Sequence, residues 1–143
     1  MNLVLSISLG YAVHALHYIA SRDDRHPVLA REIADKFKMP YDSTLKILRQ
    51  LAQAGLVTPH RGCRGGFTLV REAEAISLLD VVEAVDGPVE HGMEMPDGSG
   101  DRNLCTRTDN LFHEAALELR KKLQAFTLAD LVAANDRIDL TKG

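Results

Sequence analysis

Positively charged side chains are concentrated in one stretch of the chain that contains no acidic residue. Between Ser43 and Arg71 the sequence carries Lys46, Arg49, His60, Arg61, Arg64 and Arg71. The whole protein has a formal net charge of -3, so its overall composition does not explain this stretch. A local basic face on an acidic protein favours binding of a polyanion such as nucleic acid, although a solvated surface would give the same pattern.

Cysteine and histidine are the other side chains that could take part in a reaction or bind a metal. The chain has two cysteines and six histidines, and Cys105 with His91 or His113 would be the most obvious nucleophile and base. Glycine-rich phosphate loops, HExxH and GxSxG motifs are missing from the sequence, which therefore predicts a protein that is not an enzyme. Two cysteines do not form a secreted disulfide framework, and no segment has the pattern of a membrane span or signal peptide. We therefore expect a cytoplasmic protein.

The elements that position the basic residues begin with three helices. Apolar residues recur at helical spacing over 6–21, 29–37 and 41–54. A polar loop ending in Pro27 separates the first two helices. Pro40 suits the start of the third helix, Asp42 complements the dipole of its first turn, and Gly55 is placed to end it.

A hairpin and a long helix are predicted in the rest of the chain. Two β-type segments, 56–60 and 67–70, flank a glycine-rich basic loop, which is a hairpin signal. Ser77 and Asp80 resemble a capping box at the start of a short helix over 76–85. After a glycine- and proline-rich loop, an amphipathic helix is expected at about 107–125, and Thr127 is expected to cap a last short helix. The predicted fold is mainly α with a small β-hairpin wing, divided into a DNA-binding domain (1–86), a sensor-type loop (87–105) and a dimerisation region (106–143).

Three helices followed by a glycine-tipped basic hairpin form a winged helix-turn-helix. Its third helix fits the major groove of duplex DNA, and arginines at the tip of the wing neutralise phosphates. In the register that we assign, the third helix presents its N-terminal polar residues to base edges, and Arg49, one turn further on, contacts phosphate. The predicted DNA-binding residues are Tyr41, Ser43, Thr44, Lys46, Arg49, Arg61 and Arg64. The alternative is an adaptor that uses the same winged head for protein contacts.

Several stretches of the chain resemble the IscR/NsrR/CymR type of bacterial regulators, here called the Rrf family. The matching stretches are GYAVHALHYIA at 10–20, REIADKF at 31–37, LRQLAQAGLV at 48–57, RGCRGGFTLVR at 61–71, ISLLDVVEAVDGP at 76–88 and FTLADLV at 126–132. The resemblance covers nearly the whole chain. It implies a homodimer that is held by the long helix and places two winged heads on a palindromic operator, in most cases as a repressor.

Many members of this family hold an iron–sulfur cluster through three cysteines in the loop before the long helix. This sequence departs from that pattern, because Cys105 is the only cysteine near that loop. The resemblance leaves open a mixed-ligand [2Fe–2S] cluster on His14, His91 and Cys105, with the histidine of the first helix supplied by the partner chain. The position of the first-helix carboxylate that some relatives use is Gly10 here. The alternative is a cofactor-free regulator that responds to a small molecule or a partner protein.

Cys63 lies in the predicted wing, where relatives commonly have proline. A thiol beside Arg61 and Arg64 is expected to be open to oxidation, which would weaken the contact with DNA directly. The alternative is a cysteine with no role in signalling.

Overall fold

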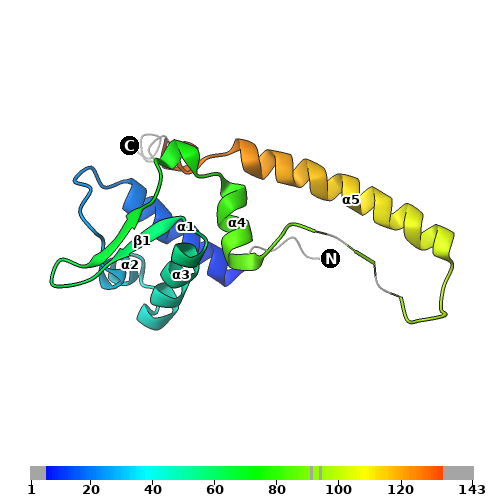
Figure 1. Ribbon diagram of the computed structural model, residues 1–143, viewed down its shortest axis with the longest axis horizontal. Coiled ribbons are helices and arrows are strands. Elements are labelled where there is room, and N and C mark those ends of the chain that lie inside the picture. The colour runs from blue at the N-terminus through cyan, green and yellow to red at the C-terminus, as the bar shows by residue number, and fades with distance from the viewer. Residues whose placement is uncertain (1–5, 91, 94, 134–143) are drawn as a thin grey trace.

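The computed structural model describes residues 6–90, 92–93 and 95–133. In this part of the chain the protein is mainly helical, with one antiparallel hairpin and a long helix near the C-terminal end (Figure 1). The fold class predicted from the sequence is therefore confirmed. The elements are α1 (Ile7–Ala20), α2 (Ala30–Phe37), α3 (Tyr41–Gln53), β1 (Val57–His60), β2 (Gly66–Leu69), the 3-10 helix η1 (Ala73–Ala75), α4 (Leu78–Asp86) and α5 (Arg102–Ala125).

One apolar core holds the three N-terminal helices, the hairpin and α4 together. Each element contributes the residues that its hydrophobic spacing places on one face. The largest fully buried apolar side chains are Leu16, Ile33, Leu48, Leu51, Leu56, Ile76, Val28 and Val57. This core fixes the orientation of α3 relative to the hairpin.

The hairpin is stiffened by a third extended segment that the hydrophobic pattern did not predict. Val28, in the loop between α1 and α2, exchanges two backbone hydrogen bonds with Phe67 of β2, with N–O distances of 2.9 and 2.8 Å. Gly66 permits this approach: its φ is +137°, and a Cβ atom there would lie 2.6 Å from the carbonyl oxygen of Val28. Glycine is the residue that tolerates both conditions.

Side-chain caps fix the ends of the helices. Ser77 and Asp80 form the predicted capping box at α4, with N–O distances of 2.9 and 3.1 Å. Thr127 and Asp130 make the same pair of bonds before a helical segment over 128–133. At the start of α1, the hydroxyl of Ser6 caps Leu9 N–H and also donates to Asp86 at the end of α4. The bond between Ser6 and Asp86 connects the start of α1 to the end of α4.

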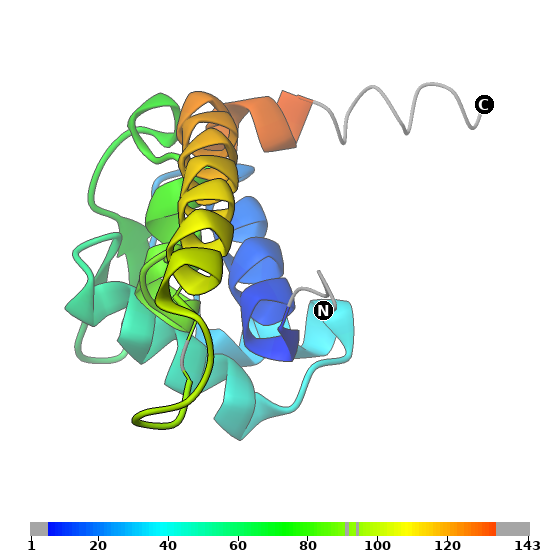
Figure 2. The same ribbon diagram turned by 90° about the vertical axis from the view of Figure 1, so that its right-hand side faces the viewer.

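Helix α5 extends away from the winged head along the length of the molecule (Figure 1). Viewed along that length, α5 stands in front of the other helices (Figure 2). Asp101 caps it, and it begins at Arg102 rather than near residue 107, so Cys105 lies in its first turn. No residue of α5 is buried, although α5 packs against α4 and Arg120 donates a hydrogen bond to Glu83. Among the described residues, no helix is long and apolar enough to cross a membrane.

Candidate nucleic-acid interface

The N-terminal half of α3 presents polar side chains to solvent. Tyr41, Asp42, Lys46 and Arg49 are exposed, and Ser43 is half-buried. The helix begins directly after Pro40, which is its N-cap residue. Four of the five residues predicted on this helix are thus accessible to a ligand, in the arrangement that a recognition helix needs to reach base edges.

Thr44 is the exception, and its predicted place on the exposed side of α3 was wrong. The residue is 1% exposed, and its hydroxyl donates to the carbonyl oxygen of Pro40 at 2.8 Å. Thr44 shares the buried face of α3 with Ile47, Leu48 and Leu51, which lie three, four and seven positions further on. Because the backbone satisfies the hydroxyl, the cost of burying this polar group is offset.

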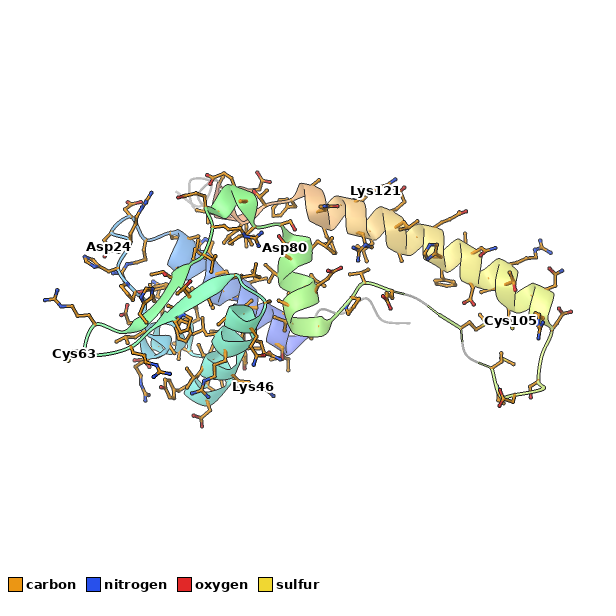
Figure 3. All side chains as sticks on the ribbon, in the orientation of Figure 1. Asp24, Lys46, Cys63, Asp80, Cys105 and Lys121 are labelled. Carbon is orange, nitrogen blue, oxygen red and sulfur yellow. The ribbon has the colours of Figure 1, made fainter. Side chains whose placement is uncertain are left out.

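The tip of the hairpin carries the remaining predicted DNA-binding residues. Arg61, Cys63 and Arg64 are all exposed in the turn between β1 and β2. Figure 3 shows Cys63 at the outermost point of the hairpin, at the end of the molecule opposite the start of α5. The turn is compact because the backbone at Gly65 lies close to the backbone of His60. A Cβ atom at Gly65 would lie 2.6 Å from the carbonyl oxygen of His60, so a larger residue would not fit there without a shift.

The cations of α3 and the wing are available for an external anion. Among the described residues, no carboxylate forms an ion pair with Lys46, Arg49, Arg61 or Arg64. Arg71, the last cation of the acid-free stretch, differs because it lies 3.9 Å from Asp80. Unpaired cations on an exposed helix and an adjacent loop form the electrostatic footprint of a phosphate-binding surface.

The loop between α1 and α2 also holds a cation, but its charge is neutralised internally. Arg22 pairs with Asp24 at 2.7 Å and with Glu32 at 3.2 Å. The hydrogen bond from Arg22 lowers the pKa of the Asp24 carboxyl below its usual range, and the backbone N–H of His26 adds to the effect. Arg22 therefore stabilises the loop that carries Val28 and is not part of the available positive surface.

Two exposed residues near the start of α3 were not predicted as site residues. Asp42 was interpreted only as a complement to the helix dipole, yet its carboxylate is exposed beside Tyr41, where it can accept a hydrogen bond from a base. Arg31, on α2, lies over the ring of Tyr41. The sequence holds no signal for this contact, because it joins residues of two different helices.

The residues proposed for a cluster do not come together within the described part of one chain. His14 is exposed on α1, where its Nδ1 lies 2.7 Å from the carbonyl oxygen of Gly10 and its ring packs edge-on against Phe37. Cys105 lies at the far end of α5, at the opposite end of the molecule from Cys63 (Figure 3). His91 lies outside the described residues. Within those residues no three side chains of His, Cys, Asp or Glu gather as metal ligands.

Comparison with known proteins agrees with this geometry. The family model Rrf2, described as iron-dependent transcriptional regulator, matches residues 5–134. The chain is 35% identical to the protein Rrf2 of Nitratidesulfovibrio vulgaris over 125 residues, which cover 85% of this chain and 82% of the relative. It is 25% identical to the transcriptional regulator NsrR of Shouchella clausii over 88% of this chain and 86% of that protein.

Solved structures show the same fold. The structure of CymR, the global cysteine regulator of B. subtilis, matches with a TM-score of 0.76 at 22% identity, over 93% of this chain and 98% of that one. IscR of T. potens matches with a TM-score of 0.72 at 25% identity, over 94% and 90% of the two chains. The resemblance found from the sequence is confirmed, and the protein is a regulator rather than an enzyme. The chain belongs to the Rrf2 family of DNA-binding transcriptional regulators.

Proposed function

We propose that two copies of this protein bind a palindromic operator and repress transcription there. In this proposal α3 of each copy lies in the major groove, and Arg61 and Arg64 of each wing contact the adjacent phosphates. The single observation that carries it is the set of exposed, unpaired cations on α3 and the hairpin tip, with polar residues at the start of the same helix. A dimer bound over the operator would exclude other proteins from that DNA.

The second copy is inferred from the surface of α5. Leu104, Leu111 and Leu119 are 61%, 65% and 42% exposed, and their spacing places them with Ala115 on one stripe of the helix. Half-buried residues of α5, among them Phe112 and Leu123, lie on the neighbouring face of the helix. An exposed leucine stripe of this length is typical of a helix that pairs with another chain.

The signal that controls DNA binding is proposed to act without an intrachain cluster. Cys63 is an exposed thiol in the wing itself, so its oxidation would alter the DNA-contacting surface directly. A small molecule or a partner protein is the alternative signal, and it would act on DNA binding whether or not Cys63 is present.

The wing assignment is tested by the salt dependence of DNA binding. A duplex is first selected with the wild-type protein from a random pool, and its Kd is measured from 50 to 200 mM salt. Each phosphate contact contributes about 0.9 to the slope of log K against log salt concentration. Arg61→Ala should therefore weaken binding and reduce the magnitude of this slope by about 0.9, the contribution of one contact. Lys121→Ala removes the same charge from α5 and is the matched control. Equal affinity of Arg61→Ala and wild type at every salt concentration would refute the proposal for the wing.

A further inference from the structure

Resting on the proposed function, we propose that Arg31 positions Tyr41 for base recognition, so that the two residues determine operator specificity as one unit. The guanidinium carbon of Arg31, the second residue of α2, lies 4.3 Å from the centroid of the Tyr41 ring, the first residue of α3. A cation at this distance over an aromatic face is held by the quadrupole of the ring. The contact therefore connects the outer surface of α2 to the part of α3 that enters the groove.

Tyr41 needs an external support because its own surroundings hold it only in part. Its side chain is a large apolar ring that stays 37% exposed. An aromatic ring with this much freedom loses rotamer entropy when it binds, and a guanidinium stacked on it reduces that loss beforehand.

Arg31 is free to contact DNA while it holds the ring. It is exposed, and within the described residues no carboxylate forms an ion pair with it. Glu32, its neighbour on α2, is engaged by Arg22 instead. The planar guanidinium can stack through its face and donate hydrogen bonds through its edge at the same time.

The docking geometry of a helix-turn-helix gives the pair two different contacts. The first helix of the motif crosses the phosphate backbone, and the second lies in the major groove. Arg31 on α2 would thus donate to a phosphate, and Tyr41 at the start of α3 would contact a base edge. A phosphate bound by Arg31 would fix the cation, and the cation would fix the ring, so backbone binding and base reading become coupled.

The test compares specificity with affinity. The specificity ratio is the Kd for an unrelated duplex divided by the Kd for a duplex selected from a random pool. The free energy of a cation–π contact at an exposed site corresponds to a roughly 2- to 5-fold change in an equilibrium constant. Arg31→Gln should therefore lower the specificity ratio by about that factor. Lys36→Gln, which removes one charge from the same helix, should leave the ratio unchanged. Arg31→Lys should restore part of the lost affinity for both duplexes but less of the ratio, because it lacks the planar stacking group.

A double-mutant cycle separates a coupled pair from two independent contacts. Tyr41→Leu should lower the specificity ratio, and adding Arg31→Gln should then change it no further. The proposal is overturned if Arg31→Gln weakens both duplexes equally, or if it lowers the ratio as much in the Tyr41→Leu background as in the wild type. If the wild-type protein enriches no duplex at low salt, the proposed function itself fails. Both residues are exposed, and equal thermal unfolding temperatures of the variants would show that folding is intact.

Discussion

Cys63 lies at the tip of the hairpin, beside the arginines that we propose contact DNA. Its thiol is exposed, and it shares the hairpin turn with Arg61 and Arg64 (Figure 3). In a reaction with hydrogen peroxide the thiolate sulfur attacks one oxygen, the O–O bond breaks, and hydroxide leaves and takes a proton from solvent to become water, so that sulfur is oxidised to sulfenic acid and peroxide is reduced. Further oxidation adds negative charge beside Arg61 and Arg64, which we propose bind phosphate, and this charge would oppose DNA binding.

We predict that hydrogen peroxide raises the Kd of the wild-type protein for its selected duplex several-fold. Cys63→Ser should bind as the reduced wild type does and should not respond to peroxide. Cys105→Ser, which removes the other free thiol at the opposite end of the molecule, should respond like the wild type. The measurement is fluorescence anisotropy before and after treatment. A loss of affinity that persists in Cys63→Ser would assign the oxidation sensitivity to another residue.

The exposure and contacts of single residues were the features of the interface that were hardest to predict from the sequence. The exposure of Tyr41, Lys46 and Arg49 follows from helical spacing and could be predicted. Thr44 was misplaced because its polar residue type suggested an exposed position, although it lies four and seven positions before the buried Leu48 and Leu51; its hydroxyl is satisfied within its own helix. The contact of Arg31 with Tyr41 depends on how α2 and α3 pack, and no spacing in the sequence contains that information.

Helix α5 exposes a stripe of apolar side chains that the described part of its own chain does not cover. Its stripe of Leu104, Leu111, Ala115 and Leu119 faces solvent, whereas Arg120, on another face of the helix, donates a hydrogen bond to Glu83 of α4. Leaving several leucines exposed on one stripe costs free energy that a second copy of the helix would recover, at about 25 cal/mol per Å² of apolar surface buried. Pairing of α5 with its counterpart is therefore the expected basis of the dimer that we propose.

A charge placed in this stripe should break the dimer. We predict that Leu111→Glu raises the dimer dissociation constant at least tenfold, because an unpaired carboxylate would have to be buried. Leu117→Glu is the matched control, since Leu117 lies on a different face of the same helix and is also exposed, at 44%. Sedimentation equilibrium measures both. Dissociation of the control variant with retention of the Leu111→Glu dimer would place the interface on the other face of α5.

At the level of helices and strands, the sequence predicted an element correctly wherever a periodic pattern or a capping motif was present. The helices over 29–37 and 41–54, the hairpin and the Ser77–Asp80 capping box were all predicted and are confirmed within a few residues. The bridge at Val28 was missed because a single paired residue leaves no alternation to detect. The first turn of α5 was missed because Leu104 directly follows a glycine- and proline-rich loop with weak periodicity, although Asp101 caps the helix.

The charge of the whole molecule is divided unevenly between the two halves of its sequence. Residues 1–70 hold nine Lys and Arg against five Asp and Glu, whereas residues 71–143 hold eight against fifteen. The basic surface lies at the end that carries α3 and the wing, and α5 extends toward the other end (Figure 1). This separation steers the winged head toward DNA and keeps the rest of the protein away from phosphates. Two heads joined through α5 would then contact two half-sites of one duplex.

The stoichiometry and affinity of the complex on a duplex selected from a random pool test the central claim most directly. We predict that native mass spectrometry shows two protein chains on the intact palindrome, and that scrambling one half-site raises the Kd about 100-fold or more, because each half-site contributes its own base and phosphate contacts. One chain per duplex, bound with equal affinity to the palindrome and to the single half-site, would contradict the account.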